Sequence, residues 1–307
     1  MDLLCTESPH FGQVIRAPMD STIVGDETVF GRLLDNQARY TVTSDYCKHI
    51  QTEVTEAMRK VLALWMSEVC EEQRCEDIVF PCAMNYLDRY LARTSVKKSQ
   101  LQLLGAVCLL MASKMRQCRP ITVESLVYYT DYSVTAEEVK AWEILVLSRL
   151  DWDMASILAN DFVDHLICWL GVRRDMHTVR RHANTFISLC ATEYNFVKYA
   201  PCLVATASVA AAIHGLGSSL ECVYSQTELV PCLQAMTGIE SELIVQCVQE
   251  IESLMATSVA SLQQQQQQTY NKMNSSAYNN TRLSSSATAS TDGSQLKTPT
   301  DVQDVNF

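Results

Sequence analysis

The chain has 307 residues, nearly half of them apolar, and a formal net charge of −11. This length allows one large or two ordinary domains with a substantial core. The acidic charge disfavours direct nucleic-acid binding, because nucleic-acid binders usually gain affinity by neutralising phosphates with basic side chains. No run of 18 or more apolar residues occurs in the sequence, so we expect no membrane span.

Composition favours an all-α fold. Aromatic residues make up only 7% of the chain, and there are only 9 glycines and 7 prolines. Sheet proteins need many turns and usually carry more of both residues. The abundance of Leu, Val, Ala and Met suits helix packing instead.

The thirteen cysteines bear on the cellular setting. The N-terminus lacks the basic and apolar regions of a secretory signal peptide. Most cysteines lie in apolar helical patterns, as Cys108, Cys190 and Cys202 do, and the sequence has no C-x-x-C. We interpret them as reduced core residues of an intracellular protein, and we expect no metal and no cofactor.

Five helices are predicted between residues 46 and 153. Their signals lie at 54–69, Pro81, 101–115, Thr122, and Thr135 with Glu138. The first carries apolar residues at steps of three and four, and proline is favoured at the first position of the second. The third is apolar on almost every side and must therefore be surrounded by other helices. The fifth begins with a capping box, Thr135 with Glu138.

The second half repeats this rhythm. Its predicted helices are Asp161–Leu170, Thr178–Glu193, Cys202–His214, Gln226–Met236 and Ser241–Met255. The middle one is again a surrounded helix of small residues, and Ser225 with Glu228 forms another capping box. The boundary between the halves falls near 152–154, so two five-helix units follow each other, each around a buried third helix.

The two ends differ from this pattern. Residues 1 to about 45 show little periodicity, and six glutamines at 263–268 precede a stretch rich in Ser, Thr and Asn. That composition is too polar to form a core, so we predict a disordered tail. The glutamine run leaves two alternatives open, an extension of the last helix or a spacer.

Motifs for catalysis are missing. The sequence contains no glycine-rich phosphate loop, no G-x-S-x-G and no H-E-x-x-H, and its six histidines are scattered. This favours a binding module over an enzyme. An unrecognised helical enzyme stays open, and a pocket with several perturbed titratable groups would support it.

Three segments, in this order and spacing, resemble the cyclin box: Met58–Gln73, Phe80–Leu91 and Leu101–Lys114. The M-R-x-x-L start and the C-E-E-Q run resemble the D-type cyclins in particular. The similarity continues through 181–187 and 190–193 in the second half. The resemblance implies two tandem five-helix cyclin folds at 25–153 and 154–258, flanked by tails at 1–24 and 259–307.

The resemblance also implies a function without catalysis. D-type cyclins bind a cyclin-dependent kinase, reposition its αC helix and so activate it to phosphorylate retinoblastoma-family proteins at the G1/S transition. Lys114 and Glu143 match family positions that hydrogen-bond to the kinase. The alternative for this pair is an ion pair within the chain.

The resemblance further implies a docking patch for R-x-L peptides of substrates and inhibitors. Its residues would be Met58, Val61, Leu62, Trp65, Leu101 and Gln102, with Glu68 at the rim. Glu68 would suit the arginine of the peptide. The alternative is that the apolar members are core residues, and for Leu62 we expect partial burial in either case.

Both ends carry short motifs of the D-type class. Leu3, Cys5 and Glu7 form L-x-C-x-E, which in these cyclins binds retinoblastoma-family pocket proteins, and alternate residues of an extended peptide can enter one groove. Thr298 precedes Pro299 and resembles the D-type phosphodegron. Its phosphate would create a ligand for a ubiquitin ligase or an export factor.

One other binding class remains open, a cyclin-fold adaptor in transcription that does not activate a kinase. That class often contacts DNA, and the acidic charge disfavours it. We expect residence in both nucleus and cytoplasm. No import signal is obvious in the sequence, so nuclear entry would depend on the partner.

Overall fold

The computed structural model describes residues 19–20, 22–172, 175–217 and 226–280, and in the last segment the side chains of 228–260. Within these ranges the chain is all-α, with no strand. The helices of the first half are α1 Glu27–Gln37, α2 Tyr46–His49, α3 Glu56–Glu72, α4 Val79–Leu91, α5 Leu101–Arg116, α6 Val123–Tyr129 and α7 Ala136–Arg149. Those of the second half are α8 Ala159–Trp169, α9 Met176–Thr192, α10 Pro201–Leu216, α11 Gln226–Thr237 and α12 Ser241–Asn280. Short 3-10 helices lie at Ala38–Tyr40, Lys98–Gln100 and Tyr194–Phe196.

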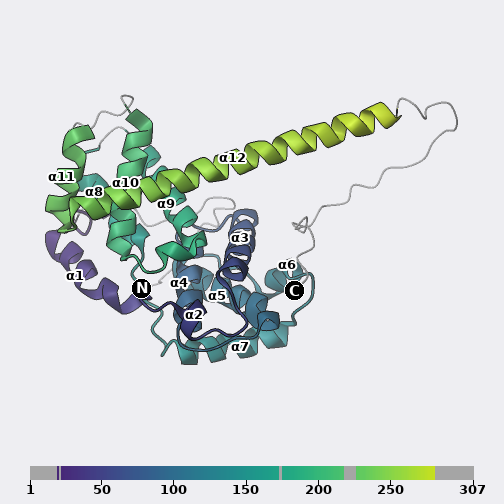
Figure 1. Ribbon diagram of the computed structural model, residues 1–307. Helices are drawn as coiled ribbons and strands as arrows, with labels where there is room; N and C mark the ends of the chain where they lie inside the picture. The colour runs from purple at the N-terminus through teal and green to yellow at the C-terminus, as the bar shows by residue number, and fades with distance from the viewer. Residues whose placement is uncertain (1–18, 21, 173–174, 218–225, 281–307) are drawn as a thin grey trace, which may run out of the picture.

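Each half surrounds one buried helix, α5 in the first half and α10 in the second, as the sequence predicted. From Leu101 to Ser113 every residue of α5 is buried except Gln102, and Cys202–Ile213 of α10 is buried throughout. Helices α3, α4, α6 and α7 pack around α5, and α8, α9, α11 and α12 pack around α10 (Figure 1). The two five-helix bundles therefore have separate cores, which follow from two separate all-apolar segments.

Capping explains where several helices begin. Thr135 accepts from the backbone N–H of Glu138, whose side chain accepts from the backbone of Thr135, so the predicted capping box is present. Thr122 caps α6 in the predicted position. Ser225, the first residue of the other predicted capping box, lies outside the described residues. Helix α4 begins at Val79, two residues before Pro81, which still lies in the first turn, where a missing N–H costs nothing.

Helix α1 is the clearest departure from the sequence-based expectation. Residues before 45 were expected to lack periodicity, and residues from 25 onward were assigned to the first unit. Instead Phe30 of α1 is buried in the core of the second half, with its ring centroid 4.6 Å from that of Trp169. The indole N–H of Trp169 donates to the carbonyl of Gly25 at 2.9 Å. Helix α1 therefore packs on the second bundle, although it precedes the first bundle in the sequence.

Helix α12 also differs from expectation. It runs through the glutamine run to Asn280 and projects far past the rest of the molecule (Figure 1), whereas the tail was predicted to be disordered from residue 259. No glycine or proline occurs between 241 and 280, and glutamine is a good helix former, so nothing in the local sequence ends the helix earlier. Of the two alternatives for the glutamine run, the structure shows the helical extension.

A buried ion pair joins the two halves. Arg59 of α3 is only 1% exposed, and its Nε and Nη2 lie 2.7 Å from the two carboxylate oxygens of Asp88 on α4. Its remaining N–H groups donate to the carbonyls of Ala191 and Thr192 at the end of α9. A guanidinium there satisfies terminal carbonyls and complements the helix dipole. One side chain therefore connects α3 and α4 to the second bundle.

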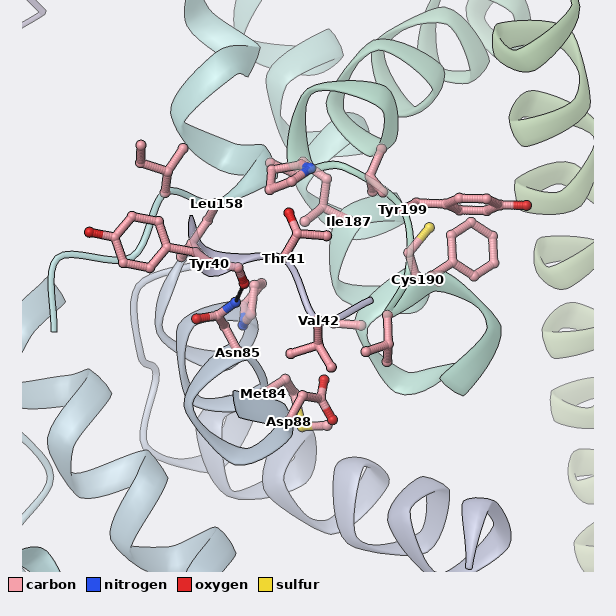
Figure 2. Close-up of a pocket in the computed structure, with 18 of the residues that line it drawn as sticks. Tyr40, Thr41, Val42, Met84, Asn85, Asp88, Leu158, Ile187, Cys190 and Tyr199 are labelled. Carbon is pink, nitrogen blue, oxygen red and sulfur yellow. Dashed lines mark hydrogen bonds between the residues drawn. The ribbon is translucent and has the colours of Figure 1, made fainter. Parts of the chain in front are cut away.

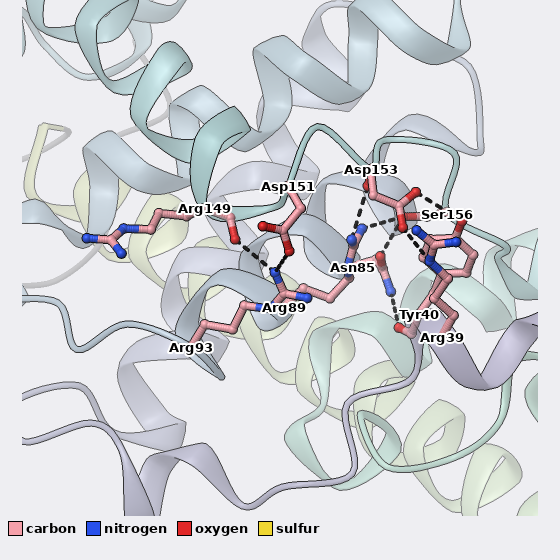
Figure 3. Close-up of polar contacts among 9 residues, drawn as sticks. All are labelled: Arg39, Tyr40, Asn85, Arg89, Arg93, Arg149, Asp151, Asp153 and Ser156. Carbon is pink, nitrogen blue, oxygen red and sulfur yellow. Dashed lines mark hydrogen bonds and ion pairs between the residues drawn. The ribbon is translucent and has the colours of Figure 1, made fainter.

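The linker between the halves is held by further polar contacts (Figure 3). Asp153 accepts from the Arg39 guanidinium at 2.7 Å and from the Tyr40 hydroxyl at 3.1 Å. Arg89 donates to the Asp153 carbonyl and to the Ser156 hydroxyl, both at 3.0 Å. Burial lowers the pKa of Arg89, and these acceptors compensate part of that cost. The linker is thereby held against α4.

Candidate functional site

Lys114 and Glu143 meet on the surface of the first half. Lys114 lies in the last turn of α5, Glu143 lies in the middle of α7, and Nζ is 2.6 Å from Oε1. The ion pair within the chain, the alternative left open by the sequence, is therefore present. Exposed pairs of this kind contribute only about 0–1 kcal/mol to stability, so opening the pair to reach a partner would cost little.

Large apolar side chains follow both members of this ion pair in the sequence. Met115 is 52% exposed, Ile144 58% and Leu145 38%. Single exposed apolar residues are ordinary, but a cluster around a charged pair is typical of an interaction surface. We call Lys114, Met115, Glu143, Ile144 and Leu145 the α5–α7 face. The sequence analysis found its two charges but missed its apolar members. The sequence pattern that could have identified the apolar members is the pair Ile144 and Leu145 directly after Glu143 on α7.

The predicted docking patch is brought together by the packing of α3 on α5. Its members differ in exposure. Val61 and Glu68 are exposed, whereas Met58, Trp65 and Gln102 are half-buried. Leu62 and Leu101 are buried, so they form the floor of the patch. Leu62 is more deeply buried than the partial burial we expected, because its side chain packs directly over Gly105 of α5.

Close helix packing and two polar contacts fix the patch. A Cβ added at Gly105 would lie 2.8 Å from Leu62 Cδ1, so only glycine lets α3 approach α5 this closely. The Trp65 indole N–H donates to the carbonyl of Tyr129 at 3.3 Å, and the Ser133 hydroxyl donates to Gln102 Oε1 at 3.5 Å. The α6–α7 turn thus borders the patch, a part that the sequence analysis missed.

Glu68 supplies the negative charge at the rim. Its pKa is raised, first by partial burial and second by the neighbouring charge of Glu71. A carboxylate whose pKa is raised in this way is stabilised by a nearby cation, because a cation favours its ionised form. An arginine from a docked peptide would provide one.

A cavity of about 110 Å³ lies between the halves (Figure 2). The segment Tyr40–Val42 runs along it, with Met84, Asn85 and Asp88 of α4 on one side and Ile187 and Cys190 of α9 on the other. Asp88 is already paired with Arg59, and Asn85 donates to the carbonyl of Tyr40 at 2.9 Å. These polar groups on the wall of the cavity thus already have hydrogen-bond partners within the chain.

Other predicted sites are not described by the structure. Leu3, Cys5, Glu7 and Thr298 all lie outside the described residues. Among the residues described, no group of three or more His, Cys, Asp or Glu side chains could hold a metal ion. No helix in the described part of the chain is long and apolar enough to cross a membrane.

Comparisons with known proteins agree with this architecture. The cyclin N-terminal domain family matches residues 28–155, and the cyclin C-terminal domain family matches residues 157–287. G1/S-specific cyclin-D3 of Homo sapiens is 45% identical over 84% of this chain and 87% of its own length. G1/S-specific cyclin-D2 of Xenopus laevis is 41% identical over the full length of both chains.

A solved structure supports the same conclusion. The X-ray structure of a viral cyclin from herpesvirus saimiri aligns with a TM-score of 0.65 and 28% identity, covering 73% of this chain and 97% of the viral one. The fold, the two domain matches and the full-length relatives point the same way. The chain belongs to the cyclin family, in its D-type branch, whose members are regulatory subunits of cyclin-dependent kinases and not enzymes themselves.

Proposed function

We propose that this D-type cyclin contacts its kinase through the α5–α7 face and activates it to phosphorylate retinoblastoma-family proteins at the G1/S transition. The observation that carries the proposal is the Lys114–Glu143 pair, exposed at Lys114 and partly buried at Glu143, with the exposed Met115, Ile144 and Leu145 directly after it in the sequence. A kinase αC helix that covers this face would bury the apolar side chains. It would also offer new hydrogen-bond partners to the two charges.

The energetics favour such an exchange. Lys114 is 45% exposed, so its pairing with Glu143 is weak in water and easily opened. Once a partner excludes water, each hydrogen bond to a charged group strengthens, and an unpaired charge becomes costly. Activation then follows from population shift, because a kinase whose αC helix is held in the active position binds the cyclin more tightly.

A pull-down with a cyclin-dependent kinase of the D-cyclin class tests the proposal. Lys114→Glu places two carboxylates face to face and should abolish both kinase binding and kinase activity. The matched control is Lys60→Glu, since Lys60 makes an ion pair with Glu193 of the same length, 2.6 Å, and similar exposure, away from the α5–α7 face. Loss in both variants would point to misfolding. No binding even by the wild-type chain would favour a cyclin-fold adaptor in transcription.

We also propose that the patch between α3 and α5 binds R-x-L peptides from substrates and inhibitors. Val61 and Trp65 would contact the peptide leucine over the buried floor of Leu62 and Leu101, while Glu68 would pair with its arginine. The raised pKa of Glu68 supports this part, because partial burial leaves a carboxylate in need of a cation.

Fluorescence anisotropy with a labelled R-x-L peptide measures this binding. Glu68→Lys should weaken it more than tenfold, and because Glu68 is exposed the fold should be unaffected. Leu243→Ala removes an exposed apolar residue on α12 in the other half and should leave the affinity unchanged. An unchanged affinity in Glu68→Lys would exclude the proposed role of this carboxylate.

At the N-terminus we propose that Leu3, Cys5 and Glu7 bind a retinoblastoma-family pocket protein. Support comes from the spacing of the motif in a chain that belongs to the D-type cyclins. Replacing all three residues by alanine should abolish pocket-protein binding while kinase binding persists. If pocket-protein binding survives this change, another surface is responsible.

At the C-terminus we propose that phosphorylation of Thr298 directs the chain to a ubiquitin ligase and shifts it from nucleus to cytoplasm. Thr298→Ala should lengthen the half-life in a cycloheximide chase and keep the protein nuclear by microscopy. An unaltered half-life and distribution would rule out this role.

A further inference from the structure

The turn between α3 and α4 brings two cysteines together. The backbone N–H of Cys75 donates to the carbonyl of Cys70 at 2.9 Å, and that of Arg74 donates to the carbonyl of Glu71 at 3.0 Å. Arg74 has a positive φ of 50°. These features define a Schellman motif, in which the third residue from the helix end and the second residue beyond it have their side chains in contact. Both positions are usually apolar, and here both are cysteine.

The two sulfur atoms interact directly. Cys70 is buried and Cys75 is half-buried, and neither forms a disulfide. A hydrogen bond from the Cys70 thiol is the largest cause of a lowered pKa at Cys75, and a hydrogen bond from Gln117 lowers it further. The same hydrogen bond is the largest cause of the raised pKa of Cys70. This arrangement places a half-buried sulfur of lowered pKa beside a second thiol that can attack it.

We propose that Cys70 and Cys75 are a redox-active dithiol that a peroxide closes reversibly to a disulfide. The Cys75 thiolate attacks one peroxide oxygen and takes it up as a sulfenic acid, while the O–O bond breaks and the other oxygen leaves as hydroxide, which solvent protonates to water. The Cys70 sulfur then attacks the Cys75 sulfur, the S–O bond breaks, and the leaving hydroxide takes the Cys70 proton to form water. Each sulfur loses one electron, and the peroxide accepts both.

Other cysteines lack this combination. Cys190 and Cys247 interact across the second core, but both are buried, and burial raises the pKa of each. A buried thiol of raised pKa is a poor nucleophile that peroxide reaches slowly. Cys82 and Cys108 are buried in the first core, and burial raises their pKa as well. Only Cys75 combines partial exposure, a lowered pKa and a cysteine partner among the described residues.

The dithiol adjoins the end of α5. Gln117 is the C-cap residue of that helix, its N–H donates to the Ser113 carbonyl, and its side-chain oxygen accepts from the Glu76 backbone at 3.1 Å. Gln117 therefore contacts the residues on both sides of the Cys75–Glu76 peptide bond. A change of bonding at Cys75 would act on the turn that carries Lys114.

Trypsin makes the proposal directly testable on the full-length chain, because it cleaves after Arg74 between the two cysteines. The protein is treated with hydrogen peroxide, free thiols are alkylated, and the digest is analysed by mass spectrometry. We expect peptides 61–74 and 75–89 to be joined by a disulfide, to separate on reduction with dithiothreitol, and to be unlinked in Cys75→Ser. Because Cys82 shares the second peptide, fragmentation must place the link at Cys75, and Cys82→Ser should retain it.

Two results would overturn the proposal, and the wild-type digest alone can give either. In one, peroxide converts Cys75 to a sulfinic acid while Cys70 is recovered alkylated, so the thiols do not join. In the other, Cys75 is recovered linked to the peptide that contains Cys118 on the neighbouring loop. Cys118→Ser is the matched control, since it removes an exposed cysteine and should leave the Cys70–Cys75 link unchanged.

Discussion

The two bundles carry ion pairs at corresponding places. In the first half the end of α5 meets α7 through Lys114 and Glu143, which lie 2.6 Å apart. In the second half the end of α10 meets α12 through His214 and Glu252, which lie 2.7 Å apart. A lysine is charged throughout the physiological pH range, whereas a histidine forms an ion pair only when it is protonated. Lys114, His214 and Glu252 are exposed and Glu143 is partly exposed, so neither pair contributes much to stability.

What lies beside the two pairs differs more. Met115 follows Lys114 and Ile144 follows Glu143, and both are more than half exposed. At the corresponding places in the second half, Gly215 follows His214 and Ser253 follows Glu252. The residues directly after the first pair are therefore large, apolar and exposed, whereas those directly after the second are small. The repeated fold supplies the same scaffold twice, and the side chains next to the first ion pair are the ones that we propose as a binding face.

The interiors of the two halves differ in whether they contain a buried ion pair. The first half buries Arg59 and Asp88, which also connect it to α9, whereas the core of the second half is built around the small residues of α10. Removing one member of a buried pair leaves an uncompensated charge. We therefore expect the first half to be far more sensitive to loss of a single charge.

Arg59→Ala tests this sensitivity and should give the largest effect. It leaves Asp88 buried with only the Tyr46 hydroxyl as a partner, and should lower the free energy of unfolding by about 3–5 kcal/mol. Lys60→Ala, which removes the exposed partner of Glu193, should cost at most about 1 kcal/mol. Urea denaturation of both variants measures the difference, and equal losses would show that burial does not set the cost.

The glycines of the two surrounded helices should respond with opposite signs. Gly105→Ala forces a Cβ to 2.8 Å from Leu62, and overpacking of this kind costs about 1–3 kcal/mol. A Cβ at Gly215 meets nothing within 4 Å, so Gly215→Ala should gain up to about 1 kcal/mol through helix propensity. Thermal unfolding measures both changes. A stabilising Gly105→Ala would mean that α3 can move away from α5 without loss.

The pH dependence of peptide binding should show the smallest effect. Since the pKa of Glu68 is raised, this carboxylate takes up its proton at a higher pH than an ordinary glutamate as the solution is acidified. The protonated form no longer attracts arginine, so affinity for an R-x-L peptide should fall as pH is lowered through that pKa, by at most about 1 kcal/mol. Glu68→Gln should bind more weakly and with a flatter pH profile. If the Glu68→Gln profile keeps the full slope, another group titrates.

Much of the fold could be predicted from local patterns. The buried helices α5 and α10 follow from segments that are apolar on all sides, and the start of α7 follows from Thr135 and Glu138. Helix α1 could not be found in this way, because its one buried side chain, Phe30, packs on Trp169 far away in the chain. A polar composition likewise indicated disorder where α12 continues as helix, since composition alone does not show where a helix without a stop signal ends.

The candidate site could be predicted only in part. The resemblance to cyclins identified Lys114 and Glu143, but their contact joins residues 29 positions apart, which no local pattern reveals. The exposure of Ile144 depends on which side of α7 packs on α5, and the closeness of Cys70 and Cys75 depends on the left-handed backbone at Arg74. Both depend on tertiary structure, whereas the sequence shows only which residue types are available.

We propose that only the first of the two corresponding ion pairs lies in the kinase-binding face. Calorimetric titration of a D-cyclin-class kinase with Glu143→Lys and Glu252→Lys tests it directly. Glu143→Lys places two lysines opposite each other within the covered surface. It should raise the dissociation constant by about a hundredfold or more, equivalent to roughly 3 kcal/mol. Glu252→Lys should leave it within about twofold, since an exposed charge outside the interface contributes little. Equal losses, or no loss in Glu143→Lys, would contradict the claim.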